Sequence, residues 1–244
     1  MGIQAVFFDA AGTLMRPQRG VGESYAALAE NYGMRVSAQD ITSRFRTCFG
    51  AAPPLAFPGA SADTIASLER DWWRTLVAQV FEPWGHFDRF DYFFADLFAY
   101  FARAEAWQLY PEVLETLTAL KARDLRLCVI SNFDSRLLKI LCGLGIDAAF
   151  DAILVSSSIG YAKPEPEIFH AALTRFNLSP AEALHVGDSE INDRQGARNA
   201  GLRGVLVDRQ APSRRDTDHI SSLSALLDLL PNPADDIVAS ARSA

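Results

Sequence analysis

The chain has 244 residues, with 23 Lys and Arg against 30 Asp and Glu, and its net charge of −7 argues against a dedicated nucleic-acid binder. Hydrophobic residues make up 49% of the chain, enough to bury a sizeable core in one large domain or in a domain with an insert. No stretch reaches the roughly 18 apolar residues that a membrane span needs, and the N-terminus lacks the pattern of a signal peptide. We therefore expect a cytoplasmic protein without nucleic-acid or membrane partners. The net negative charge does not exclude a small anionic ligand, because a local site can still be cationic.

The first expected element is a strand over residues 3–8, an apolar and β-prone run that ends at Asp9 and leads into a turn. The segment that follows is typical of helices and shows no convincing strand. Apolar residues recur there at helical spacing, and Ser37 is a good N-cap. Helices are expected at four places: residues 22–31, 37–49, 61–80 and 90–101. This pattern predicts an all-helical domain over residues 16–108.

From Tyr110 onward, strands alternate with helices. The strands are expected at residues 125–130, 152–155, 183–186 and 204–207. The helices are expected at residues 112–122, 135–144, 165–176, 191–200 and 221–230. Such alternation is typical of a parallel sheet with helices on both faces, which the first strand must join. We therefore predict an α/β fold in which residues 1–15 and 109–244 form a Rossmann-like parallel sheet core, with the helical domain inserted.

Several expected strands end next to residues that can carry chemistry. In open α/β sheets, ligands bind beyond the carboxyl ends of the strands. Each such residue alone would be an ordinary helix cap or loop residue, but together they collect at one sheet edge. The set consists of Asp9, Ser131, Asn132, Lys163, Asp188 and Asp193. The four histidines, among them His185, show no metal-ligand spacing and are expected to be structural or at the surface.

Four segments, FFDAAGTL, VISNFD, YAKPEP and HVGDSEIND, resemble in this order the four motifs of the haloacid dehalogenase (HAD) superfamily. The ISNFD stretch and the overall layout are most similar to the REG-2-like hydrolases of that superfamily. The resemblance covers the first strand and residues 110–208, and it implies that residues 16–108 are the family's helical cap. It also implies a Mg²⁺-dependent phosphatase acting on a small, phosphorylated anionic substrate.

The resemblance further implies a role for each residue at the sheet edge. Asp9 would be the nucleophile that forms an aspartyl phosphate, with Ser131 and Lys163 as catalytic partners. Ser131, the backbone around Asn132, and Lys163 would bind the phosphate. Mg²⁺ would be held by Asp9, the backbone carbonyl of Ala11, Asp188 and Asp193. Elementary electrostatics agrees, because a carboxylate can attack a phosphate dianion only if Mg²⁺ and a lysine screen both charges.

The chain departs from the family's phosphatases at Ala11, where they usually carry a second Asp. That Asp protonates the leaving oxygen and then activates the water that cleaves the phosphoenzyme, and alanine can do neither. General acid–base catalysis typically contributes about 10²–10⁴-fold. We therefore expect weak hydrolysis of alkyl phosphates and a smaller loss with good leaving groups.

Two alternatives remain open. The family's 2-haloacid dehalogenases also lack this Asp and need no metal, so Asp9 would attack carbon while a cap arginine such as Arg44 or Arg46 held the carboxylate or halide. The acid at Asp188 is nevertheless typical of the magnesium form. The other alternative is a catalytically impaired module that binds a metabolite or a protein.

A phosphonoacetaldehyde hydrolase would need a cap lysine, and residues 1–120 contain none. Exposed cap aromatics would favour a homodimer.

Overall fold

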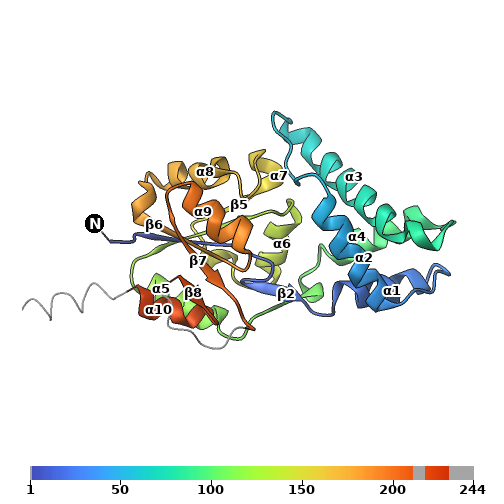
Figure 1. Cartoon of the computed structure of the whole chain (residues 1–244), viewed down its shortest axis with the longest axis horizontal. Coiled ribbons are helices and arrows are strands. Elements are labelled where there is room, and N and C mark those ends of the chain that lie inside the picture. The colour runs from blue at the N-terminus through green and yellow to red at the C-terminus, as the bar shows by residue number, and fades with distance from the viewer. Residues whose placement is uncertain (1, 211–217, 231–244) are drawn as a thin grey trace, which may run out of the picture.

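A six-stranded sheet lies at the centre of the computed structural model, which describes residues 2–210 and 218–230 (Figure 1). Its strand order is β5–β4–β1–β6–β7–β8, and every neighbouring pair is parallel. The strands are β1 (Ala5–Phe8), β4 (Arg126–Ser131), β5 (Ala152–Val155), β6 (Ala183–Gly187), β7 (Arg203–Val207) and β8 (His219–Ile220). The predicted parallel α/β sheet is confirmed, and β8 extends it by a strand too short to leave a pattern in the sequence.

Side chains alternate along β1 and divide the core into two layers. Val6 and Phe8 pack on one face, and Ala5 and Phe7 pack on the other. The first face is covered by three helices: α5 (Val113–Lys121), α6 (Arg136–Gly143) and α10 (Leu226–Leu229). The second is covered by α8 (Pro166–Phe176) and α9 (Gly196–Asn199). Because both faces are buried, the strands are almost continuously apolar, which is why they were predictable.

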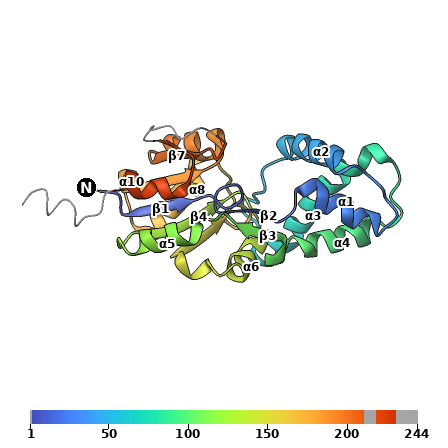
Figure 2. The ribbon, with the colours of Figure 1, turned by 90° about the horizontal axis from the view of Figure 1, so that it is seen from below.

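Four helices between β1 and β4 enclose a second hydrophobic core, rich in aromatic side chains. These helices, here called the cap, are α1 (Val21–Glu30), α2 (Ala38–Ala51), α3 (Ala62–Phe81) and α4 (Phe90–Tyr100). Each lies within one or two residues of its predicted range. Figure 2 shows the cap as a lobe beside the sheet. No helix in the described ranges is long and apolar enough to cross a membrane.

The expectation that residues 16–108 contain no strand is wrong at both ends of that segment. β2 (Met15–Pro17) pairs antiparallel with β3 (Trp107–Leu109), so the two chain crossings between sheet and cap run side by side (Figure 2). Three residues are too few for an alternating pattern to be recognised. The two predicted boundaries of the helical insert, after residue 15 and after residue 108, lie within these two paired strands. Short helical turns complete the fold: Glu82–Trp84, Ala104–Ala106, Asp147–Ala149, α7 (Ser156–Ile159), Pro180–Glu182 and Leu223–Ala225.

The helix expected over residues 191–200 is split in two. Its first part, η5 (Glu190–Gln195), is a π-helical turn, and α9 follows it. This turn packs tightly on β7, since a Cβ atom at Gly204 would lie 2.3 Å from the carbonyl oxygen of Arg194. Single π turns often occur at functional sites, and this one carries Asp193. The helix expected over residues 221–230 is likewise a 3-10 turn followed by the short α10.

Candidate active site

Four of the predicted residues form one buried hydrogen-bonded network at the carboxyl edge of the sheet. Lys163 Nζ lies 2.7 Å from Asp9 Oδ1 and 2.6 Å from Asp193 Oδ1. Ser131 Oγ donates to Asp9 Oδ1 at 3.3 Å. Asp9 follows β1, Ser131 ends β4, and the π turn after β6 supplies Asp193. All four residues are buried, so the ammonium group is held between two carboxylates away from water.

Two glycines allow the acidic side chains to approach this edge closely. Gly12 has φ +98°, and a Cβ atom there would lie 2.2 Å from Asp188 Oδ2. A Cβ atom at Gly187 would lie 2.1 Å from Asp193 Cγ. Any larger residue would displace the carboxylates. Steric crowding by Asp188 and Asp193 therefore explains why the DAAG and VGD segments carry glycine at positions 12 and 187.

Three carboxylates at this edge lie close enough together to hold a divalent cation. Asp9, Asp188 and Asp193 each offer one oxygen atom, and these atoms all lie within 4.8 Å of one another. In the part of the chain that the structure describes, Lys163 is the only lysine or arginine that pairs with these acids. An oxygen-rich set with excess negative charge fits Mg²⁺. Both oxygens of Asp193 already accept hydrogen bonds, one of them from the Ser189 amide at 3.0 Å, so Asp9 and Asp188 are better direct ligands.

Burial and mutual repulsion shift the titration of these groups. Partial desolvation, together with the charges of Asp9 and Asp193, raises the pKa of Asp188 to about 7, although the residue as a whole is exposed. Burial also raises the pKa of Asp9, with Asp193 adding to the shift and Lys163 opposing it. Burial alone would lower the pKa of Lys163, but the carboxylates of Asp193 and Asp9 outweigh it and raise that pKa. A bound cation would favour the charged form of each acid.

The Asn132 side chain joins two loops of the site. Its Nδ2 donates to the carbonyl of Lys163 at 2.7 Å, and its Oδ1 accepts from the Lys163 amide at 2.7 Å. The side-chain amide of Asn132 is therefore already paired with the backbone of Lys163. The reciprocal pair also fixes the distance between the Ser131 loop and the Lys163 loop.

Ala11 lies half-buried in the turn that follows Asp9, and its methyl group has no proton to transfer. The turn is held from the far side by Arg209, which donates to the carbonyls of Thr13 at 2.7 Å and Gly12 at 3.5 Å. Arg209 also forms an ion pair with Glu112. The backbone that carries the Ala11 carbonyl is thus held by contacts that do not involve Asp9, Asp188 or Asp193.

His185 is a residue of the site that sequence reasoning missed. Its Nε2 lies 2.9 Å from Asp193 Oδ1, and the ring is fully buried. Burial lowers the pKa of His185, although the hydrogen bond and the charge of Asp193 oppose this shift. The available signal was a polar residue inside the otherwise apolar strand ALHVG. The expected structural role is thus tied to the orientation of Asp193.

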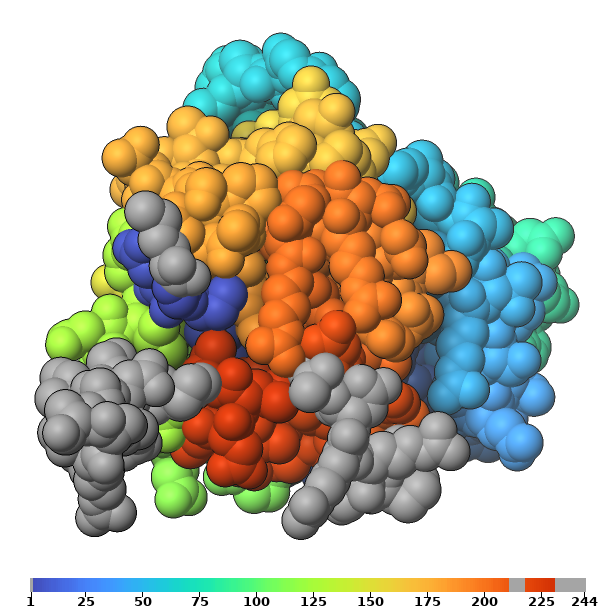
Figure 3. All heavy atoms as spheres, turned by 60° about the vertical axis from the view of Figure 1, so that its left-hand side comes forward, coloured from blue at the N-terminus to red at the C-terminus, as the bar shows by residue number. Residues whose placement is uncertain are grey.

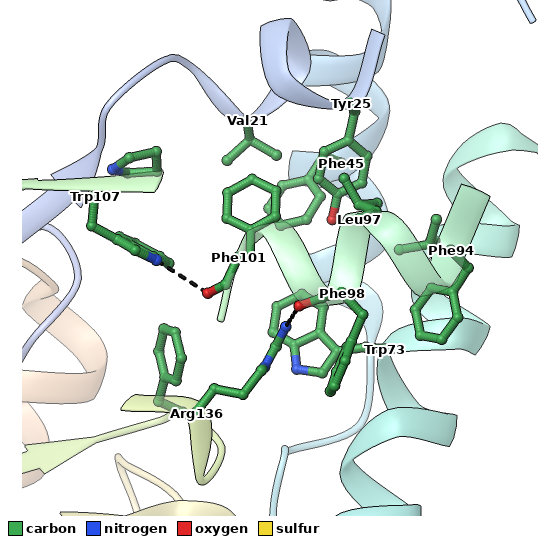
Figure 4. Close-up of a pocket in the computed structure, with 13 residues that line it drawn as sticks. Val21, Tyr25, Phe45, Trp73, Phe94, Leu97, Phe98, Phe101, Trp107 and Arg136 are labelled. Atoms are coloured by element: carbon green, nitrogen blue, oxygen red, sulfur yellow. Dashed lines mark hydrogen bonds between the residues drawn. The ribbon is translucent and has the colours of Figure 1, made fainter. Parts of the chain in front are cut away.

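An apolar cavity of about 80 Å³ lies where the cap meets the core, next to the loop that follows Asn132 (Figure 4). The cap contributes side chains such as Phe45, Trp73 and Phe98, and the core contributes Phe133 and Arg136. Arg136 is the only charged residue of this wall, and it is paired with Asp134 and lies 3.8 Å from the centroid of the Phe98 ring. The cavity therefore offers an apolar surface without an unpaired charge.

Comparisons with known sequences agree with the motif pattern. A family model described as haloacid dehalogenase-like hydrolase matches residues 3–201. Human haloacid dehalogenase-like hydrolase domain-containing protein 3 is 36% identical over 237 residues, which cover 94% of this chain and 93% of that protein. The rhythmically expressed gene 2 protein of Drosophila melanogaster is 28% identical, covering 83% and 82%, and it confirms the predicted REG-2-like resemblance. Phosphoserine phosphatase of Thermus thermophilus is 38% identical over 112 residues, 46% of this chain and 45% of that enzyme.

Solved structures share the fold over almost the whole chain. The HAD-hydrolase YfnB of Bacillus subtilis, bound to magnesium, aligns with a TM-score of 0.73 at 20% identity, covering 94% of this chain and 99% of that one. L-2-haloacid dehalogenase of Xanthobacter autotrophicus aligns with a TM-score of 0.70 at 22% identity, covering 93% and 98%. The fold is thus shared by a HAD-hydrolase bound to magnesium and by a 2-haloacid dehalogenase. On the family match and the sequence relatives together, the chain belongs to the haloacid dehalogenase-like hydrolases.

Proposed function

We propose that this chain is a Mg²⁺-dependent phosphomonoester hydrolase that works through an aspartyl phosphate on Asp9. The observation that carries the proposal is the Lys163 ammonium group, held 2.7 Å from Asp9 beside a cluster of three carboxylates. An anionic substrate can approach the Asp9 carboxylate only when the negative charges of both are screened, and the Lys163 ammonium group and a bound cation would do this. The partial match to a phosphoserine phosphatase supports a phosphorylated substrate.

The hydrogen bonds of Asp9 indicate different roles for its two carboxylate oxygens. Lys163 and Ser131 both donate to Oδ1, which leaves Oδ2 to attack the phosphorus atom as the bond to the leaving oxygen breaks. Lys163 and Ser131 then face the oxygens of the transferring phosphoryl group. A bound Mg²⁺, held by Asp9, Asp188 and the Ala11 carbonyl, would supply further charge stabilisation. Water finally hydrolyses the aspartyl phosphate.

Ala11 restricts the substrates that this site can turn over. Without a proton donor near the leaving oxygen, the leaving group must depart as a stable anion, as aryl oxides and carboxylates do. Without the same group as a base, water attacks the phosphoenzyme slowly. We therefore propose slow turnover, with small aryl or acyl phosphates hydrolysed better than alkyl phosphates.

The 2-haloacid dehalogenase alternative has less support from the site. Asp188 is present and lies against Gly12 beside Asp9, in the arrangement of a cation site. Arg44, considered for holding a carboxylate, instead donates to the Gln79 carbonyl at 2.9 Å and pairs with Glu82, both within the cap. Arg46 is exposed.

The test is hydrolysis of p-nitrophenyl phosphate with Mg²⁺ and with EDTA, comparing wild type with Asp9→Asn. Asp88→Asn is a matched control, because its carboxylate is 85% exposed and lies in the cap. We expect turnover that requires Mg²⁺, is lost in Asp9→Asn and is retained in Asp88→Asn. Halide release from 2-haloacids without metal would instead support the dehalogenase. Equal, negligible rates in all three proteins, with ligand binding that survives Asp9→Asn, would support the non-catalytic module.

A further inference from the structure

Glu69 is a buried carboxylate in the middle of α3, and it bonds to the core domain. The residue is only 2% exposed. Its Oε1 accepts from the Ser135 amide at 2.9 Å and from Ser157 Oγ at 2.6 Å. Its Oε2 accepts from Ser135 Oγ at 2.5 Å. A buried carboxylate is costly unless donors satisfy it, so these bonds make the docking of α3 specific.

The two donor residues lie on different catalytic loops. Ser135 is four residues beyond Ser131 and directly precedes α6, whose N-terminal amides and positive dipole end favour a carboxylate. Ser157 belongs to α7, six residues before Lys163. One cap side chain therefore bridges the outer ends of the two segments that Asn132 joins at the site.

A second contact one turn along α3 supports the same docking. Trp73 Nε1 donates to Asp134 Oδ2 at 2.6 Å, and Arg136 holds that carboxylate from the other side. Figure 4 shows Trp73 and Arg136 together against Phe98, beside the apolar cavity. Ser156 Oγ also donates to the carbonyl of Leu55, and in Figure 3 the cyan part of the cap lies against the yellow segment of the core.

We propose that Glu69 is a positioning residue through which the docked cap holds the Ser131 and Lys163 loops in register. This inference rests on the proposed function, in which both loops face the phosphoryl group. All three hydrogen bonds need an acceptor at Glu69. Loss of the carboxylate would release the Ser135 amide and the Ser157 hydroxyl together, and the two loops would no longer share a support on the cap.

Glu69→Met tests this with little change in side-chain length, because the methionine side chain has no oxygen to accept from the Ser135 amide, the Ser135 hydroxyl or the Ser157 hydroxyl. We expect hydrogen exchange at the Ser135 amide and in residues 157–163 to rise by about 10- to 100-fold, the usual weight of a charge-assisted bond. With p-nitrophenyl phosphate, kcat should fall by about tenfold or more, since small misplacements are costly, while KM stays within about twofold. Glu30→Met is the control, because the Glu30 side chain lies in the cap and is 61% exposed.

Ser157→Ala provides a second, milder variant. It removes one donor, so we expect a smaller effect than in Glu69→Met, and the double variant should lose less than the product of the two single effects. The inference is overturned if Glu69→Met matches Glu30→Met in exchange and in kcat. It is also overturned if exchange rises equally in α1 and α8, which would mark general loosening. If wild type hydrolyses no phosphate ester, the proposed function fails, while the exchange data still decide whether Glu69 fixes the two segments.

Discussion

Lys163→Met tests how far this site depends on one buried cation. Lys163 is 4% exposed and lies between Asp9 and Asp193, so methionine preserves the volume but leaves both carboxylates without their shared partner. Removing one partner of a buried ion pair costs about 3–5 kcal/mol. In a domain of this size, each kcal/mol shifts Tm by about 2–4 °C, so the loss corresponds to roughly 6–20 °C.

The assay is thermal unfolding at pH 7 in EDTA, followed by circular dichroism. Lys139→Met is the matched control, because Lys139 is exposed on α6. We also expect added Mg²⁺ to recover part of the loss, since it would screen the carboxylates that Lys163 leaves behind. A Lys163→Met protein that melts within about 2 °C of Lys139→Met would contradict this prediction, because the unpaired buried carboxylates would then not destabilise the fold.

Two further substitutions probe the turn after Asp9. Ala11→Asp should raise kcat/KM for an alkyl phosphate by about 10²-fold or more, and should raise kcat/KM for p-nitrophenyl phosphate much less, because this constant reports the transfer to Asp9 and the p-nitrophenyl leaving group needs no proton; equal gains in kcat/KM for both substrates would count against a proton-transfer role. Glu112→Gln should lower the free energy of unfolding at pH 7 by about 1–3 kcal/mol, because it breaks the pair with Arg209 that anchors the turn. Burial opposes ionisation of Glu112, but Arg209 outweighs it and holds the pKa of Glu112 below its usual range, so this stabilisation is present above about pH 4.5 and is lost as pH falls further. Urea titrations at pH 7 and pH 3 check this, and an undiminished gap at pH 3 would be inconsistent with it.

Most of the catalytic edge was predictable because short-range rules fix it. An apolar run that ends at a polar residue marks the end of a buried strand, and parallel strands bring such ends to one edge. Asp9, Ser131 and Lys163 therefore meet where the pattern of strands predicts. The steric need for glycine at positions 12 and 187 was not predicted, because it depends on the packing of Asp188 and Asp193 against them.

What could not be predicted depends on contacts between distant segments. Glu69 stands among charged neighbours in the stretch LERDWWR, which is typical of an exposed helix face. Its burial comes from Ser135 and Ser157, which lie 66 and 88 residues further along the chain. The π turn that carries Asp193 is set by its fit against β7, and β2 and β3 are too short to leave a periodic signal.

In the proposed reaction, Asp9 becomes phosphorylated and Ala11 cannot help water to remove the phosphoryl group. The most direct measurement mixes the Mg²⁺-loaded protein rapidly with p-nitrophenyl phosphate, and then determines the mass of the quenched protein. We predict a burst of p-nitrophenol close to one equivalent per protein, a phosphoryl adduct on Asp9, and no burst in Asp9→Asn. Linear release without an adduct, or no release at all, would contradict the account.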